Sequence, residues 1–251
     1  MTTPAADEPA AAAAARPAFI PLEANPELMT DLVRKLGLSA ALQCHDVFSI
    51  DEPEMLAFIP RPALALLLVF PVAAAYESHR LAEDSVLAEY SGSGDAEPVM
   101  WFRQTIRNAC GMMAIVHAVS NGPARGFIAP GSTFDKLIKD ATPLAPAERA
   151  RLLETNADLA AQHKAAASRG DTEAPAASDD VDLHYVCFVK ADDGTLWELD
   201  GRRKGPLARG TLADSEDVLS EKALLLGPRA FLERSGGDMR FSIVALAQSL
   251  D

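Results

Sequence analysis

The chain has 251 residues, which is long enough for one large domain with a substantial hydrophobic core. Its 36 acidic and 23 basic residues give a net charge of −13, which argues against nucleic acid and favours a basic protein or peptide as partner. Cys44, Cys110 and Cys187 are odd in number and widely spaced, which argues against a disulfide framework or a zinc site. We therefore expect a reducing, cytoplasmic location, with the nucleus as a second one, and no cofactor or metal.

The N-terminal residues 1–18, MTTPAADEPAAAAAARPA, are rich in alanine and proline and include two acids. They match neither a secretory signal nor a mitochondrial presequence, so we expect a disordered tail followed by one domain over residues 19–251. The longest apolar run, Ala63 to Tyr76, has 14 residues and is interrupted by Pro71, whereas a membrane span needs about 20. We therefore expect no membrane contact and interpret the run as a central strand buried on both faces.

Hydrophobic periodicity and turn residues predict the other elements of the N-terminal two thirds. The predicted strands lie at 46–50 and 64–70. The first predicted helix covers 27–36, with Gly37 as its C-cap, and the second runs from Asn108 as N-cap to about Ser120. The third runs from Ser132 or Thr133 to about Lys139. A longer fourth helix starts at Pro146 and continues through AERARLLETNADLAAQHKAA.

The C-terminal third begins with a polar segment, Arg169–Asp180, that has no apolar periodicity and predicts a mobile loop. Strands are expected over 184–190, 195–199 and 240–247. The sequence has no internal repeat, and its strands and helices do not alternate regularly. It predicts one domain of the α/β or α+β class with a largely antiparallel sheet.

Cys110 lies at the predicted N-terminus of an apolar helix, where unpaired N–H groups and the helix dipole favour a thiolate. An isolated cysteine is more often a small core residue, and that alternative stays open on position alone. Two neighbours favour a nucleophile. Gly111 leaves backbone space beside the sulfur, and the amide of Gln104 can donate to the oxyanion of a tetrahedral intermediate.

A nucleophilic cysteine needs a base, and the chain has five histidines. His117 is about 10 Å from Cys110 along the helix and is expected to be a core residue. His163 is expected to be solvated on a polar helix, and His45 and His79 have no supporting signal. His184 remains: it begins a strand directly after the predicted loop, where we expect its side chain to be exposed but rigidly held.

Asp200 is the candidate that orients this base. A three-residue turn, Asp192-Asp193-Gly194, pairs Ala191 with Thr195 and makes Asp200 the diagonal neighbour of His184 on one face of the hairpin. Cys187 alternates to the opposite face and is expected to be buried. A turn one residue longer or shorter moves Asp200 to the other face, which leaves a solvated turn acid as the alternative.

These four residues lie among short motifs that follow one another along the chain. The motifs are PLEANPE at 21–27, DV at 46–47, IPRP at 59–62, QTIRNACG at 104–111, IVHA at 115–118, GS at 131–132, ERARLLE at 148–154, TEAP at 172–175, DLHY at 182–185, ELDGR at 198–202 and MRFSIVAL at 239–246. In these motifs and their order, residues 19–247 resemble the ubiquitin C-terminal hydrolase family of papain-like cysteine peptidases, in particular its short single-domain members.

The resemblance implies a central antiparallel sheet flanked by helices, with a knotted backbone. It implies thiol-dependent hydrolysis of small or flexible adducts from the C-terminal glycine of ubiquitin or of a ubiquitin-like modifier. Carried over by position, it implies Cys110 as nucleophile, His184 as general base and acid, Asp200 as its orienting acid and Gln104 as oxyanion donor. The segment 169–180 becomes a crossover loop that the substrate's tail passes beneath.

The implied partner is ubiquitin or a ubiquitin-like modifier, whose basic tail suits the net charge of −13. We expect a monomer with no nucleic-acid or membrane partner. The implied ubiquitin contacts are Pro21, Leu22, Glu23, Ala24, Asn25, Pro26, Ala167, Ser168, Arg169, Gly170, Asp171, Thr172, Glu173, Ala174, Asp238, Met239, Arg240, Phe241, Ser242 and Ile243.

The sequence departs from the family pattern at Phe19, where tryptophan is usual, and at Arg209, where the short members often have histidine. Two other functions compete. One is a ubiquitin-binding module without catalysis. The other is a different Cys-His-Asp acyl-transfer enzyme, such as an arylamine acetyltransferase or a transglutaminase, although PLEANPE and TEAP have no role in those families.

Overall fold

The computed structural model describes residues 17–171, 175–177, 179, 181–234, 238 and 240–250. Residues 1–16, most of the predicted tail, lie outside this part, so the predicted domain limits stay a prediction. Within the described ranges, no helix is both long enough and apolar enough to cross a membrane.

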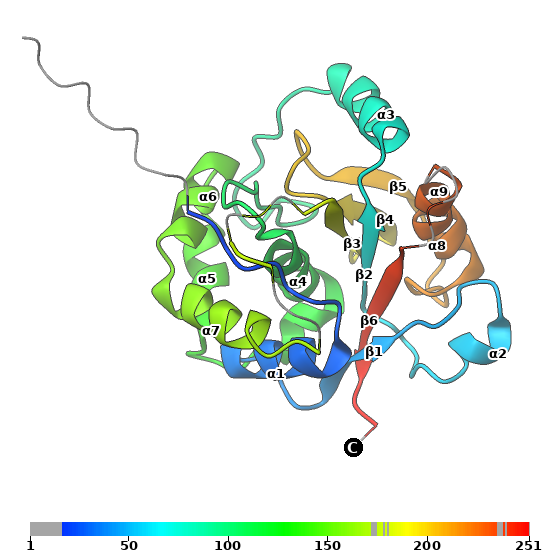
Figure 1. Cartoon of the computed structure of the whole chain (residues 1–251), viewed down its shortest axis with the longest axis horizontal. Coiled ribbons are helices and arrows are strands. Elements are labelled where there is room, and N and C mark those ends of the chain that lie inside the picture. The colour runs from blue at the N-terminus through cyan, green and yellow to red at the C-terminus, as the bar shows by residue number, and fades with distance from the viewer. Residues whose placement is uncertain are drawn as a thin grey trace, which may run out of the picture.

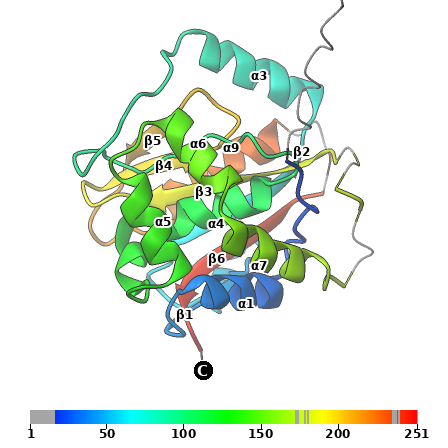
Figure 2. The same cartoon turned by 90° about the vertical axis from the view of Figure 1, so that its left-hand side faces the viewer.

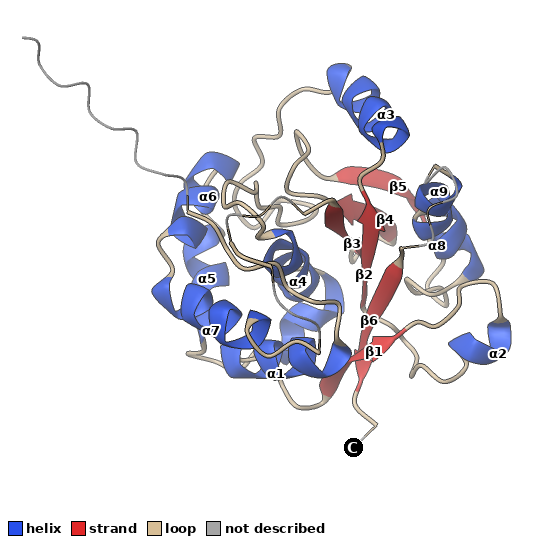
Figure 3. Ribbon diagram, in the orientation of Figure 1, coloured by secondary structure: helices blue, strands red, loops and turns tan. Residues whose placement is uncertain are grey.

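A six-stranded sheet forms the centre of the molecule, and every neighbouring pair of its strands is antiparallel, as predicted (Figure 3). Its spatial order is β1-β6-β2-β3-β4-β5. The strands are β1 (Leu42–Asp46), β2 (Ala65–Pro71), β3 (Leu183–Lys190), β4 (Thr195–Leu199), β5 (Leu207–Thr211) and β6 (Ser242–Gln248). Every residue of β2 is buried, which confirms the predicted central strand.

Helices cover both faces of the sheet (Figure 1). One face carries α1 (Pro26–Leu36), α4 (Cys110–Ser120), α5 (Thr133–Ala141), α6 (Pro146–Glu154) and α7 (Ala157–Ala167). On the other side lie α2 (Pro53–Leu56), α8 (Glu221–Leu226) and α9 (Pro228–Glu233). Helix α3 (Ala74–Ser85) lies beyond one end of the sheet, as Figure 2 also shows, and a 3₁₀ helix, Gly122–Phe127, follows α4.

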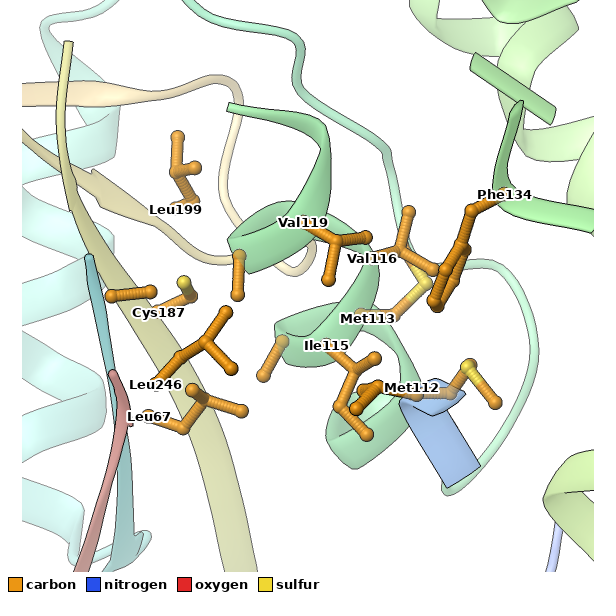
Figure 4. Packing of buried hydrophobic residues seen from close by; sticks show 14 of the residues in the cluster. Leu67, Met112, Met113, Ile115, Val116, Val119, Phe134, Cys187, Leu199 and Leu246 are labelled. Atoms are coloured by element: carbon orange, nitrogen blue, oxygen red, sulfur yellow. The ribbon is translucent and has the colours of Figure 1, made fainter. Parts of the chain in front are cut away.

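Helix α4 is the central helix of the larger core cluster, and its residues from Gly111 to Ser120 are all buried. A helix that is apolar all round must be covered on every side. Figure 4 shows the residues that cover α4: Leu67, Cys187 and Leu246 of the sheet lie on one side of the helix, and Phe134 of α5 lies on the other. The packing fixes the position of Cys110 at its first turn.

Several predicted boundaries were wrong, and local interactions explain them. The long helix from Pro146 divides at Thr155, because the Asn156 side chain accepts from the Leu159 N–H and starts α7 as a new helix. The first strand lies at Leu42–Asp46 rather than 46–50, because its pairing with β6 ends at Asp46. The apolar run from Ala63 ends as a strand at Pro71.

Asn108 does not cap α4. Its backbone lies in the left-handed region, with φ of 56°, and its side-chain amide donates to the carbonyls of Ala177 and Asp179 at 3.1 Å each. The residue therefore ties the segment before Cys110 to the predicted loop. That loop is described only in part, so its predicted mobility stays a prediction.

Candidate active site

Cys110 is the first residue of α4, as predicted, and its side chain is half-buried. The backbone N–H groups of Gly111 and Tyr185 hydrogen-bond to its sulfur. Gly111 is needed here because a Cβ at this position lies 2.9 Å from the Cβ of Leu22. The absence of a side chain lets the N-terminal segment cross close to the nucleophile.

The hairpin of β3 and β4 brings His184 and Asp200 together through the predicted register. Lys190 pairs with Leu196, and the Ala191 N–H donates to the Thr195 carbonyl at 2.9 Å, across a turn in which Gly194 has φ of 82°. His184 Nε2 lies 2.8 Å from Asp200 Oδ1. Because Nε2 faces the carboxylate, the hydrogen bond between His184 and the Cys110 thiol falls to Nδ1.

The expectation that His184 is exposed was wrong. The residue is 3% exposed, and its ring packs edge-on against Phe70 of β2 at 5.8 Å. The start of β3 lies inside the sheet next to β2 rather than at a free edge. A buried imidazole is held in one orientation, which suits a base that must face both an acid and a thiol.

The hydrogen bonds of Asp200 fix its fully buried carboxylate. Oδ1 accepts from the Arg202 N–H at 2.8 Å as well as from His184, and the Tyr76 hydroxyl donates to Oδ2 at 3.4 Å. The backbone carbonyl of Asp200 accepts from Trp101 Nε1 at 3.1 Å. These contacts satisfy an anion that is costly to bury alone.

The pKa values of Cys110, His184 and Asp200 shift in the direction that favours a Cys110 thiolate beside a protonated His184. Burial acts to raise the pKa of the Cys110 thiol, but the hydrogen bond and charge of His184 outweigh it and hold the pKa below its ordinary value. Burial acts to lower the pKa of His184, yet the Asp200 charge and hydrogen bond raise it to about 9. Although burial opposes it, His184 holds the pKa of Asp200 well below its usual range.

Gln104 lies on the loop before α4, close to Asp200. Its backbone N–H donates to the Gly201 carbonyl at 2.8 Å, directly after Asp200, and its Nε2 donates to the Ile106 carbonyl at 3.2 Å. Its Oε1 is buried and has no hydrogen-bond partner among the described residues. One amide N–H is therefore used locally, and the second can point toward a substrate.

A hollow of about 490 Å³ opens beside Cys110, and we call it the tail groove. The three predicted ubiquitin-contact segments meet around it: Pro21–Ala24, Ala167 and Ser242 each form part of its wall. The Asn25 side chain donates to Asp171 at 3.0 Å, which joins the first two segments, and Arg240 of the third pairs with Asp182, outside the three segments, at 2.8 Å. Of the predicted contacts, Thr172, Glu173, Ala174 and Met239 lie outside the described residues.

The sequence model of the family described as "Ubiquitin carboxyl-terminal hydrolase, family 1" matches residues 19–226. The chain belongs to the ubiquitin carboxyl-terminal hydrolase family. This confirms the predicted family and, at the level of the family, the predicted enzyme class of ubiquitin C-terminal hydrolases, which are cysteine peptidases.

Relatives match along nearly their whole length. Ubiquitin carboxyl-terminal hydrolase 3 of Arabidopsis thaliana is 32% identical over 231 residues, which cover 92% of this chain and 94% of the plant protein. Ubiquitin carboxyl-terminal hydrolase isozyme L1 of Homo sapiens is 35% identical over 229 residues, or 91% of this chain and 98% of the human protein.

A solved structure agrees on the fold. The catalytic domain of Trichinella spiralis UCH37, bound to ubiquitin vinyl methyl ester, superposes with a TM-score of 0.70 over 92% of this chain and 95% of that one, at 20% sequence identity. The likeness confirms the predicted fold class, whereas the knotted backbone stays an expectation of the resemblance.

Two other histidines, His117 and His163, are buried and form hydrogen bonds with backbone groups. His117 is a fully buried core residue, as predicted, and its Nε2 accepts from the Phe102 N–H at 3.0 Å. The prediction that His163 is solvated was wrong: it is 1% exposed, donates to the Ile20 carbonyl at 2.7 Å and stacks on Phe19 at 4.5 Å. Its helix covers the N-terminal segment.

Sequence reasoning missed two tyrosines that support this site. Tyr185 follows the base, and its hydroxyl donates to the Leu22 carbonyl at 2.9 Å, which fastens the wall of the tail groove. The motif DLHY contains it, so its presence was a usable signal. Tyr76 reaches Asp200 from α3, a helix that the sequence did not predict, and nothing in the local pattern pointed to that contact.

Proposed function

We propose that the chain hydrolyses the bond between the C-terminal glycine of ubiquitin, or of a ubiquitin-like modifier, and small or flexible adducts. The observation that carries the proposal is the arrangement of a half-buried cysteine with lowered pKa, a histidine bonded to it, and a buried aspartate 2.8 Å from that histidine. The arrangement supplies a nucleophile, a proton carrier and an orienting charge.

In the first step, the Cys110 thiolate attacks the carbonyl carbon of the terminal glycine. The carbonyl oxygen becomes an oxyanion, which accepts from Gln104 Nε2–H. His184 then gives its proton to the departing nitrogen or oxygen, and the C–N or C–O bond breaks, leaving a thioester on Cys110.

In the second step, His184, now neutral, takes a proton from water, which attacks the thioester carbonyl. The C–S bond breaks, the thiolate re-forms beside protonated His184, and ubiquitin leaves with a free carboxylate. Asp200 keeps the imidazole in one tautomer through both steps and stabilises the imidazolium.

Four findings support ubiquitin as the substrate. The chain belongs to a family named for this activity, and the solved structure of similar fold holds ubiquitin vinyl methyl ester. The tail groove has both Glu23 and Cys110 in its wall. The chain's net charge of −13 suits a basic tail.

The deciding experiment is labelling with ubiquitin that carries an electrophile at its C-terminus, followed by peptide mapping. We expect one adduct, on Cys110, in the native chain and in the control Cys187→Ala, and none in Cys110→Ala. A chain that binds ubiquitin tightly but takes no label and turns over no ubiquitin ester is the binding module without catalysis, and the proposal then fails.

The preference for small or flexible adducts rests on the crossover segment. Asn108 ties its described part to the loop before Cys110, and Arg169 pairs with Asp31 of α1 at 2.9 Å. If the substrate's tail passes beneath this segment, as the family resemblance implies, the segment excludes folded leaving groups. We expect slow cleavage of an isopeptide-linked ubiquitin dimer beside fast cleavage of a small ubiquitin ester, and equal rates contradict the size filter.

A further inference from the structure

Gly201 directly follows Asp200 and lies against Gln104. Its carbonyl accepts the Gln104 backbone N–H at 2.8 Å. A Cβ at Gly201 would lie 2.9 Å from both the Gln104 nitrogen and the Gln104 Cβ, and 3.1 Å from the Phe102 carbonyl oxygen. Atoms that are not bonded pack best at about 3.5–4.0 Å, so a side chain does not fit between the two segments. The φ of Gly201 is not positive, so glycine is needed here for space and not for backbone conformation.

The turn that contains Gly201 is held on the side of Asp200. The Asp200 backbone carbonyl accepts from Trp101 Nε1 at 3.1 Å, and Asp200 Oδ1 accepts from the Arg202 N–H at 2.8 Å. Asp200 and Trp101 are both fully buried. The residues on either side of Gly201 are therefore fixed by hydrogen bonds, so we expect a side chain at Gly201 to displace Gln104 rather than the turn.

Gln104 is the more easily displaced of the two contacting residues. It lies in residues 101–105, which belong to no helix or strand, and it is half-buried. Its Nε2 donates to the Ile106 carbonyl over a long 3.2 Å, and its buried Oε1 has no hydrogen-bond partner among the described residues. The side-chain amide therefore depends on packing for its position, and Gly201 provides such a contact at the Gln104 Cβ.

We propose that Gly201 is a positioning residue for the oxyanion donor: it sets where the Gln104 amide lies relative to the carbonyl that Cys110 attacks. The proposal rests on the proposed function, in which that amide donates to the oxyanion. The turn then serves two parts of the reaction, because Asp200 orients the base and Gly201 positions the donor. A donor must match the place where charge develops, and a displacement of about 1 Å can lower the rate about 10²-fold.

The first test is Gly201→Ala, assayed with a ubiquitin ester. We expect kcat per folded molecule to fall by about 10–100-fold and KM to stay within about twofold, because the amide acts on charge that exists only in the transition state. Gly126→Ala is the matched control, since a Cβ at Gly126 meets nothing within 4 Å. Its kcat and KM should equal those of the native chain.

A double-mutant cycle shows whether Gly201 acts through Gln104. In a Gln104→Ala background, Gly201→Ala should lower kcat by less than about twofold, because no amide remains to be displaced. A residue that only supports the fold would lower kcat by the same factor in both backgrounds. That result would overturn the positioning role.

The alternative route, through Asp200, is tested by the reactivity of Cys110. Alkylation with iodoacetamide depends on the thiolate, and so on His184 and Asp200, but it does not use the Gln104 amide. The pH dependence of alkylation in Gly201→Ala should match that of the native chain. A shifted pH dependence would mean that the substitution acts on the acid, and the assignment to the oxyanion donor would be wrong.

Hydrogen exchange in the native chain tests the contact even if Gly201→Ala does not fold. The Gln104 backbone N–H should exchange at least about 10²-fold more slowly than an unstructured amide, because it is bonded to the Gly201 carbonyl. Exchange at the unstructured rate would overturn the coupling between the two residues.

Two outcomes distinguish a failure of this role from a failure of the proposed function. If the native chain cleaves the ubiquitin ester and Gly201→Ala is as active as Gly126→Ala, the positioning role fails and ubiquitin hydrolysis stands. If the folded native chain does not cleave the ester, the proposed function itself fails.

Discussion

His117 and His184 are both buried in one molecule but are held in opposite protonation states. Burial lowers the pKa of His117 to about 4, whereas the Asp200 carboxylate overcomes burial and raises the pKa of His184 to about 9. His117 Nε2 accepts a backbone N–H, which suits a neutral ring, while His184 Nε2 faces an anion. The comparison teaches that the bonding partner, and not the depth of burial, decides the charge of a core histidine.

The strongest test of this comparison is His184→Ala. We expect turnover of a ubiquitin ester to fall at least about 10³-fold, because both proton transfers lose their carrier. The variant should also lose about 1–3 kcal/mol of stability, since it removes a hydrogen bond from the buried Asp200 carboxylate. Activity per folded molecule, with folding checked by circular dichroism, is the measurement.

His117→Ala is the matched control. It should cost about 2–4 kcal/mol, because it opens a cavity in the core and leaves the Phe102 N–H without its acceptor. Activity per folded molecule should stay near the native value. If His117→Ala abolished turnover in a folded chain and His184→Ala spared it, the assignment of the base would be wrong.

Gln104→Ala should have the next largest effect. We expect the catalytic rate to fall by about 10²–10³, because the amide is directed at charge that exists only in the transition state. Ubiquitin affinity, measured by titration with an inactive Cys110→Ala background, should change little. An equal loss of affinity and rate would instead make Gln104 a residue that positions the substrate.

The register of the catalytic hairpin could be predicted from the sequence because turn chemistry fixes it. A glycine in the left-handed position after two aspartates sets one loop length, and the loop length decides which side chains share a face. Cys110 at the start of α4 follows in the same way from a local pattern: a polar loop, then an unbroken apolar run that must be covered.

The surroundings of the site could not be predicted, because they depend on long-range packing. His184 was expected at an exposed edge, but whether a strand start is covered depends on which strand pairs beside it, here β2. His163 is polar in sequence but buried because the N-terminal segment crosses its helix, with Phe19 on the ring. Helix propensity carries no information on such partners.

Cysteine reactivity extends the comparison from the histidines to the thiols. Burial raises the pKa of Cys44 to about 12 and also raises that of Cys187, whereas the pKa of Cys110 is lowered by His184 against the effect of burial. At pH 7 we expect iodoacetamide to modify Cys110 alone in the folded chain. His184→Asn should slow this reaction by about 10–100-fold, because each unit of pKa changes the thiolate fraction tenfold.

Mass spectrometry of the alkylated peptides over time measures all three cysteines in one experiment. The native chain in urea provides the reference in which every thiol is exposed. Modification of Cys187 at the rate of Cys110 in the folded chain would contradict the burial of β3. An unchanged rate of Cys110 modification in His184→Asn would mean that His184 does not lower the pKa of the Cys110 thiol.

The smallest expected effect is on stability, and its sign differs between the two histidines. The folded pKa of His184 is raised, so its contribution to stability is complete below the unfolded value of about 6.5 and is lost as pH rises toward about 9. The folded pKa of His117 is lowered, so its contribution is complete above about 6.5 and is lost as pH falls toward about 4.

In the native chain, the pH dependence that His184 gives to stability is cancelled by that of Cys110. Between about pH 6.5 and 9, folding adds a proton to His184 and removes one from Cys110, whose pKa is lowered, so the two slopes oppose each other. Cys110→Ala removes the thiol but leaves Asp200, which supplies the largest contributions that raise the pKa of His184. In that background, the free energy of unfolding should fall by about 1 kcal/mol per pH unit above pH 6.5.

Urea unfolding from pH 5 to 9 checks this prediction in three proteins: Cys110→Ala alone, with His184→Asn, and with His117→Asn. His184→Asn should abolish the slope above pH 6.5 and keep the one below it. His117→Asn should keep the slope above pH 6.5 and reduce the one below it, where the lowered pKa values of His163 and His79 still contribute. The double variants differ in total stability, but the slopes depend only on protons exchanged during unfolding, so they remain comparable. Equal slopes in all three proteins would mean that the two rings titrate alike, and the contrast between a carboxylate partner and an N–H partner would not hold.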